Sequence, residues 1–231
     1  MTLYCFEAIG DQLQRTETMT ATRIHLIRHG EVHNPDGILY GRLPNFGLSQ
    51  RGHKMALLAA QELLSQGRSV ATLRVSPLQR TRESAAPIQE LFGLEPIVEE
   101  RVIEPHNKFE GSTVSIDNIL RRPSTWWLLR NPFRPSWGEP FVLVRNRMLA
   151  SIEDAWANTQ SGDAVIVSHQ MPIWITHLAI GGHKLFHNPK LRRCALSSIT
   201  SFEKIDGKFV EVDYCEPAAS LLDGAIDVGA V

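Results

Sequence analysis

Residues 23–31 read RIHLIRHGE, a short apolar strand that ends in Arg28 and is followed directly by His29 and Gly30. Similar apolar runs predict strands at 72–76, 96–99, 164–168, 198–204 and 208–212. Helical periodicity appears between them at 49–66, 79–92, 141–159 and about 172–180. Because strands alternate with helices, we expect an α/β fold. Its mainly parallel central sheet carries helices on both faces and has an antiparallel edge at the C-terminal end.

Local signals mark the ends of several of these elements. Ser49 is expected to cap the helix at 49–66. Ser76, followed by Pro77, is expected to cap the helix at 79–92 in the same way, with the proline at the first helical position. Asp206 and Gly207 stand between the last two strands and predict a hairpin turn.

The chain is long enough for one large domain, which we place at 22–215. Residues 1–21 lack a clear period and are expected to be an N-terminal appendage, and 216–231 a peripheral C-terminal tail. The segment 112–140 interrupts the alternation with tryptophans, arginines and prolines. We expect it to be a helical or loop insertion that folds over the site.

The composition limits the kinds of partner. A formal net charge of −1 gives no reason to expect nucleic acid or an anionic membrane. No apolar run approaches the ~18 residues of a transmembrane helix, and three cysteines without a metal-like spacing favour the reducing cytoplasm. The chain has no P-loop and no GxGxxG segment, so we expect no nucleotide cofactor, and its histidines give no reason to expect a metal. The oligomeric state is left open, a homo-oligomer included.

Residues that can bind an anion follow three of the predicted strands. Arg28 and His29 come at the end of the first strand, Arg80 soon after the strand at 72–76, and His169 with Gln170 after the strand at 164–168. Ligands of open α/β sheets bind beyond the carboxyl ends of the strands. Helix N-termini and arginine forks both suit phosphate oxygens. Each motif alone has a structural explanation, but their repetition at three strand ends predicts a phosphate site.

The segments RHGE (28–31), LSQRG (48–52), SPLQRT (76–81) and VSH (167–169) resemble, in this order, the signatures of the histidine phosphatase, or phosphoglycerate mutase-like, superfamily. The resemblance runs from about residue 23 to about residue 205. It implies a phosphoglycerate mutase-like fold and a nucleophilic His29 that is transiently phosphorylated. It also implies that Arg28 and Arg80 bind the phosphoryl group and that His169 donates to a phosphoryl oxygen, with the backbone N–H of Gln170 beside it.

The resemblance further implies a carboxylic acid that carries protons, several residues before a closing Glu-Gly pair. Glu104 matches this place, with Glu110 and Gly111 as the closing pair. The spacing is one residue shorter than in many relatives, so Glu110 is the alternative proton carrier. Asn34 lies one place nearer to the RHG segment than the usual asparagine of the family and is the candidate for its phosphate contact.

We expect a metal-independent phosphatase that acts on a small phosphorylated molecule. Val32, Gln170 and Pro140 depart from the residues usual in the mutases, and four prolines within 112–140 disfavour a continuous closing helix. Two alternatives stay open. One is phosphoryl transfer of the phosphoglycerate mutase type, and the other is a catalytically silent family member that binds a phosphorylated ligand. The presence together of Arg28, His29, Arg80, Glu104 and His169 argues against the silent member, because binding alone needs no nucleophile.

Overall fold

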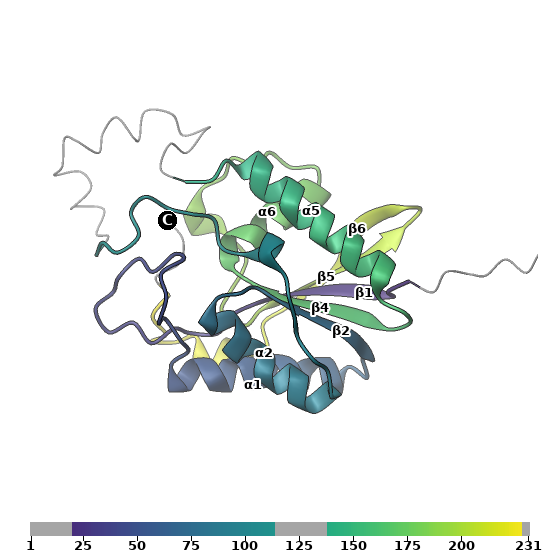
Figure 1. Cartoon of the computed structure of the whole chain (residues 1–231), viewed down its shortest axis with the longest axis horizontal. Helices are drawn as coiled ribbons and strands as arrows, with labels where there is room; N and C mark the ends of the chain where they lie inside the picture. Colours follow the sequence, from purple (N-terminus) through teal and green to yellow (C-terminus); the bar gives the residue numbers. More distant parts are fainter. Residues whose placement is uncertain (1–19, 114–137, 228–231) are drawn as a thin grey trace, which may run out of the picture.

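A computed structural model describes residues 20–113 and 138–227 of the chain. Within these ranges a six-stranded sheet, in the order β3-β2-β4-β1-β5-β6, forms the middle layer (Figure 1). The strands are β1 (Arg23–Arg28), β2 (Val70–Val75), β3 (Ile97–Val98), β4 (Asp163–Ser168), β5 (Ile199–Ile205) and β6 (Lys208–Cys215). The first four pair in parallel, whereas β5 runs antiparallel to β1 and β6 antiparallel to β5. The predicted mainly parallel sheet with an antiparallel C-terminal edge is confirmed.

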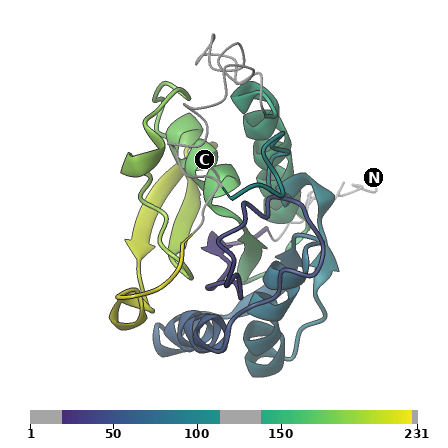
Figure 2. The same ribbon diagram turned by 90° about the vertical axis from the view of Figure 1, so that its left-hand side faces the viewer.

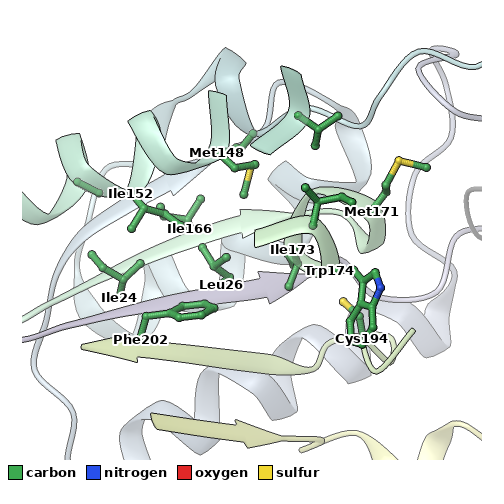
Figure 3. Close-up of a cluster of buried hydrophobic side chains, with 14 of the residues drawn as sticks. Ile24, Leu26, Met148, Ile152, Ile166, Met171, Ile173, Trp174, Cys194 and Phe202 are labelled. Atoms are coloured by element: carbon green, nitrogen blue, oxygen red, sulfur yellow. The ribbon is translucent and has the colours of Figure 1, made fainter. Parts of the chain in front are cut away.

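Helices cover both faces of this sheet, as predicted. The described helices α1 (Gln50–Ser65) and α2 (Gln79–Phe92) lie on one face, and α5 (Phe141–Asn158) and α6 (Gln170–Ile180) on the other (Figure 1). Successive side chains of a strand point to opposite faces. In β1, Leu26 packs toward α5 and α6 (Figure 3), and Ile27 belongs to the cluster under α1 and α2. The central strand β4 is buried at every position, so its residues 164–167 are all apolar instead of alternating.

The local signals were right in two places and wrong in one. The Ser49 hydroxyl accepts from the Gly52 N–H and caps α1. Asp206 and Gly207 both have positive φ, 50° and 76°, as the hairpin between β5 and β6 requires. The predicted cap at Ser76 is wrong: α2 begins at Gln79 with Leu78 at the cap position. The Ser76 side chain instead contacts His169, the residue that follows the neighbouring strand β4.

The segment 216–227 continues from β6 and packs along α1. It contains the short 3₁₀ helix η4 (Ala219–Leu221). Ala218 is fully buried against Met55 of α1 and Leu196, and Leu221 packs on the same cluster. A stretch whose composition predicts a peripheral tail therefore has a small apolar core of its own, although the domain limits of 22 and 215 remain a prediction.

Two of the predicted segments fall largely outside the described residues. Of the appendage 1–21 only residues 20–21 are described, and of the insertion 112–140 only 112–113 and 138–140. The prediction of a lid over the site lies outside the described part of the chain. Among the helices that are described, none combines the length and the apolar character needed to cross a membrane.

Candidate active site

The sheet order brings three strand ends together. Strand β4 lies between β1 and β2, with Ser168 opposite Arg28 and Val167 opposite Val75. The residues that follow, His29 and His169, therefore meet at one edge of the sheet. Their ring centroids are 5.3 Å apart and their planes are inclined by 64°. The two histidines that the strand-end rule predicts to converge lie next to each other.

His29 is buried, and one of its ring nitrogens makes a hydrogen bond within its own loop. Its Nδ1 lies 2.8 Å from the carbonyl oxygen of Gly30, and because a carbonyl only accepts, Nδ1 carries the proton. Burial holds the pKa of His29 well below its usual value, and the positive charges of Arg80 and Arg28 lower it further against the opposing effect of the Gly30 carbonyl. His29 is therefore neutral near pH 7 with a free electron pair on Nε2, which is the state that a nucleophile needs.

Two buried guanidinium groups flank the histidines. Arg80 donates from Nη2 to the Gly41 carbonyl at 2.7 Å and lies over the Tyr40 ring, 4.7 Å from its centroid. Arg28 donates from Nη1 to the Cys194 carbonyl at 2.7 Å. The Nε atoms of both arginines are buried and have no hydrogen-bond partner in the described part of the chain. Unused, desolvated N–H donors of this kind suit the oxygens of a phosphoryl group.

His169 is held by Ser76 from the neighbouring strand end. Its Nε2 is 2.8 Å from the Ser76 hydroxyl, which has no other side-chain partner among the described residues. Because a hydroxyl can donate or accept, this contact allows either neutral tautomer. Burial, followed by the charge of Arg80, holds the pKa of His169 well below its usual value. The Nδ1 atom accepts from Arg80 Nη2 at 3.2 Å, and because a guanidinium only donates, neutral His169 carries its proton on Nε2, toward Ser76.

Glu104 is the carboxylate next to His169. It follows the short helix η1 (Glu100–Val102), which the Ser168 hydroxyl ties to the end of β4 by a 2.7 Å bond to the Val102 carbonyl. Glu104 Oε2 lies 3.8 Å from His169 Nδ1, and its buried Oε1 has no partner among the described residues. Burial raises the pKa of Glu104 and outweighs the neighbouring arginines, so that the group keeps its proton above the usual range of a carboxyl.

Glu110, the alternative proton carrier, has a different environment. Its Oε1 accepts from the Asn107 N–H at 2.9 Å, and its side chain packs against Gly41. Glu110 closes a loop, whereas Glu104 lies beside His169. The geometry favours Glu104, and its role as the proton carrier stays a prediction.

The side chains of Asn34 and Gln170 make hydrogen bonds outside the cluster of Arg28, His29, Arg80 and His169. The Asn34 amide donates to the Ile38 carbonyl at 2.8 Å and accepts from the Ile38 N–H at 3.0 Å, which closes its own loop. Gln170 is the first residue of α6, and its Oε1 accepts from Arg192 at 3.2 Å. Neither residue has a described hydrogen bond to Arg28, His29, Arg80 or His169. Their phosphate contacts stay predictions.

The glycine of the LSQRG segment has a packing role. A Cβ atom on Gly52 would lie 2.0 Å from the Glu31 carbonyl oxygen, so α1 can touch the RHGE loop only with glycine here. The Glu31 carboxylate accepts from Ser49, the cap of α1. The two signature segments are therefore parts of one packed unit that fixes the backbone beneath His29.

Four further residues at the site were not predicted from the sequence: Tyr40, Ser76, Arg192 and Asp227. Burial lowers the pKa of Arg192, and the Glu104 carboxylate opposes this effect. The sequence carries no signal for their contacts; even that of Ser76 depends on the order of the strands, which the sequence pattern does not predict. Within the described ranges no group of three or more His, Cys, Asp or Glu side chains is arranged to hold a metal ion.

Comparisons with known proteins find a matching family. A family model described as histidine phosphatase superfamily (branch 1) matches residues 24–216. The uncharacterized protein Rv0525 of Mycobacterium tuberculosis is 45% identical over 199 residues, which are 86% of this chain and 98% of the relative. Phosphoserine phosphatase 1 of Hydrogenobacter thermophilus is 33% identical over 166 residues, 69% of this chain and 76% of the relative.

Solved structures share the fold at lower sequence identity. The phosphoserine phosphatase of Entamoeba histolytica, crystallised in complex with 3-phosphoglyceric acid, superimposes with a TM-score of 0.68 at 21% identity. The match covers 83% of this chain and 95% of that structure. The phosphoglycerate mutase-like fold implied by the signature segments is confirmed.

Proposed function

Because this chain belongs to the histidine phosphatase superfamily, we propose that it is a phosphatase that hydrolyses a small phosphorylated molecule through a phosphohistidine at His29. One observation carries the proposal. A buried, neutral His29 lies beside His169 between two guanidinium groups with unused N–H donors, and a carboxyl with a raised pKa is adjacent. A binding protein needs none of this nucleophile and acid chemistry.

In the first step, His29 Nε2 attacks phosphorus and the bond from phosphorus to the leaving oxygen breaks. The Glu104 carboxyl gives its proton to that oxygen, so the product leaves as a neutral alcohol. The unused N–H groups of Arg28 and Arg80 stabilise the negative charge on the three equatorial oxygens. The step leaves a phosphohistidine and a Glu104 carboxylate.

In the second step, the Glu104 carboxylate takes a proton from water while the water oxygen attacks phosphorus. The phosphorus–nitrogen bond breaks, inorganic phosphate forms, and His29 recovers its electron pair. Protein groups alone supply the charge stabilisation in both steps, so we expect full activity in the presence of a metal chelator.

The 33% identical relative, a phosphoserine phosphatase, supports a small phosphorylated metabolite as the substrate. We therefore propose to screen phosphoserine and 3-phosphoglycerate first, followed by sugar phosphates, nucleotides and phosphopeptides. Free phosphate is the measured product.

The decisive variant is His29→Ala, which removes the covalent route and should lower kcat by several orders of magnitude. The matched control is His33→Ala, since His33 lies in the same loop but is exposed. Brief incubation with a ³²P-labelled substrate should label the wild-type chain in an acid-labile bond and leave His29→Ala unlabelled. Near-normal turnover by His29→Ala would exclude the proposal.

Two other outcomes would assign a different function. The chain would be a mutase if, with bisphosphoglycerate as primer, it isomerises 3-phosphoglycerate much faster than it releases phosphate. Phosphate binding without turnover on any substrate of the panel would identify a silent member of the family.

A further inference from the structure

Arg28 is held from the solvent side by Asp227, a residue 199 positions away in the sequence. Asp227 Oδ2 accepts from Arg28 Nη1 at 2.8 Å, and Oδ1 accepts from Nη2 at 2.5 Å. The Cys194 carbonyl accepts from the same Nη1 at 2.7 Å. The carboxylate thus pairs end-on with both terminal nitrogens of a guanidinium that is itself buried.

Counting the donors of Arg28 shows what this pairing leaves available. A guanidinium has five N–H groups in one plane. Asp227 takes one from each terminal nitrogen, and the Cys194 carbonyl takes the second one of Nη1. The two for which the described residues provide no acceptor are on Nε, which is buried, and on the Nε side of Nη2. These two N–H groups are parallel and form a fork that matches two oxygens of a phosphoryl group.

We propose that Asp227 is a positioning residue for phosphoryl binding, which fixes the Arg28 guanidinium so that its Nε and Nη2 donors face the phosphoryl group of the substrate. The inference rests on the proposed function, since it assigns a role within the same site. It makes the segment 216–227 a functional part of that site.

The rest of this segment is anchored in a way that holds Asp227 in place. The Ile226 N–H donates to Glu31 Oε1 at 2.8 Å, and Glu31 belongs to the RHGE loop. Arg51, in the first turn of α1, donates to the Asp223 carbonyl at 3.4 Å. Together with buried Ala218, these contacts hold the segment against α1; the yellow loop that follows the last strand lies beside this blue helix in Figure 2.

An inhibitory role for Asp227 makes the opposite prediction. A carboxylate that occupies the phosphoryl site has to leave before substrate binds, so its removal would strengthen phosphate binding. The donor count favours positioning, because a phosphoryl group can take the Nε and Nη2 fork while Asp227 stays on the far side of the guanidinium. The sign of the effect on affinity therefore separates the two roles.

The test measures the binding of inorganic phosphate to the full chain by titration calorimetry, which does not depend on turnover. We expect Asp227→Asn to weaken binding about tenfold, the effect of losing a hydrogen bond to a charged group. Asp223→Asn is the matched control, because Asp223 lies in the same segment with an exposed side chain, and it should bind like the wild type.

Chemical rescue distinguishes a positioning role from a purely structural one, because added formate would not restore phosphate binding if Asp227 only stabilised the fold. In Asp227→Ala, added formate can occupy the vacated position next to Arg28, and we expect it to restore phosphate binding. Formate that competes with phosphate in this variant, or tighter phosphate binding by Asp227→Asn, would assign the inhibitory role instead. Unchanged binding in both variants would show that the contact has no part in phosphate recognition. If the wild-type chain itself binds no phosphate, the proposed function fails together with this inference.

Discussion

Replacing Glu104 by glutamine tests whether this carboxyl carries the proton to the leaving group. Glu104 Oε2 lies 3.8 Å from His169 Nδ1, and burial raises the pKa of the group. Glutamine occupies nearly the same space but cannot release a proton. General acid catalysis contributes about 10²–10⁴ in rate, which corresponds to about 2.7–5.4 kcal/mol of the activation free energy. We expect kcat to fall by this factor on an alkyl phosphate, whose leaving oxygen must be protonated.

The same variant should behave differently with a good leaving group. On p-nitrophenyl phosphate the leaving oxygen departs without a proton, so the rate of the first step, measured as the burst of p-nitrophenolate, should fall by less than about tenfold. The control is Glu110→Gln, because the amide oxygen can still accept from the Asn107 N–H, and this variant should retain activity on both substrates. In the wild type, kcat on the alkyl phosphate should fall as the pH rises through the raised pKa of Glu104, and this limb should vanish in Glu104→Gln. A selective loss in Glu110→Gln instead would refute the assignment.

Three other perturbations follow from the site. Ser76→Ala removes the contact that holds His169 Nε2 and should lower kcat about tenfold with little change in KM, measured by steady-state kinetics; an effect confined to KM would contradict the role. Gly52→Ala puts a Cβ atom against the Glu31 carbonyl and should lower the free energy of unfolding, measured with urea, by about 3 kcal/mol. An unchanged midpoint of urea unfolding would show that the RHGE loop can move away from the added Cβ atom without cost. The folded-state pKa values of His29 and His169 are lowered, so the folded chain binds fewer protons than the unfolded chain, and stability should fall as the pH decreases below about 6.5. Each histidine contributes a slope of about 1.4 kcal/mol per pH unit, and His169→Asn should reduce the total slope by that amount.

Much of the site could be predicted because the fold converts local patterns into spatial neighbours. Apolar runs in the sequence mark strands, and the carboxyl ends of parallel strands share one edge of the sheet. His29 and His169 therefore meet although 140 positions separate them. The shared edge of the sheet brings the two histidines together, so their convergence could be predicted without knowing the conformation of the loops.

What could not be predicted depends on contacts without a periodic pattern. A serine before a proline has the features of a helix cap, and only the pairing of β2 with β4 shows that Ser76 faces His169. Asp227 follows a stretch without a regular hydrophobic repeat, and its contact with Arg28 is purely tertiary. Asn34 has a local contact that its place in the sequence does not indicate, because its short amide side chain closes a turn with Ile38.

Arg28 Nε, Arg80 Nε and Glu104 Oε1 are buried and have no partner among the described residues. Each such atom costs the folded chain about 1–3 kcal/mol, and an anion that satisfies the two donors relieves part of this cost. A ligand that binds only the folded chain raises the free energy of unfolding, by about 2.7 kcal/mol at a concentration one hundred times its Kd. The melting temperature of the protein is therefore a direct report of which phosphorylated molecules fit. Dye-based melting of the inactive His29→Ala variant can rank an entire metabolite library before a single turnover has been observed.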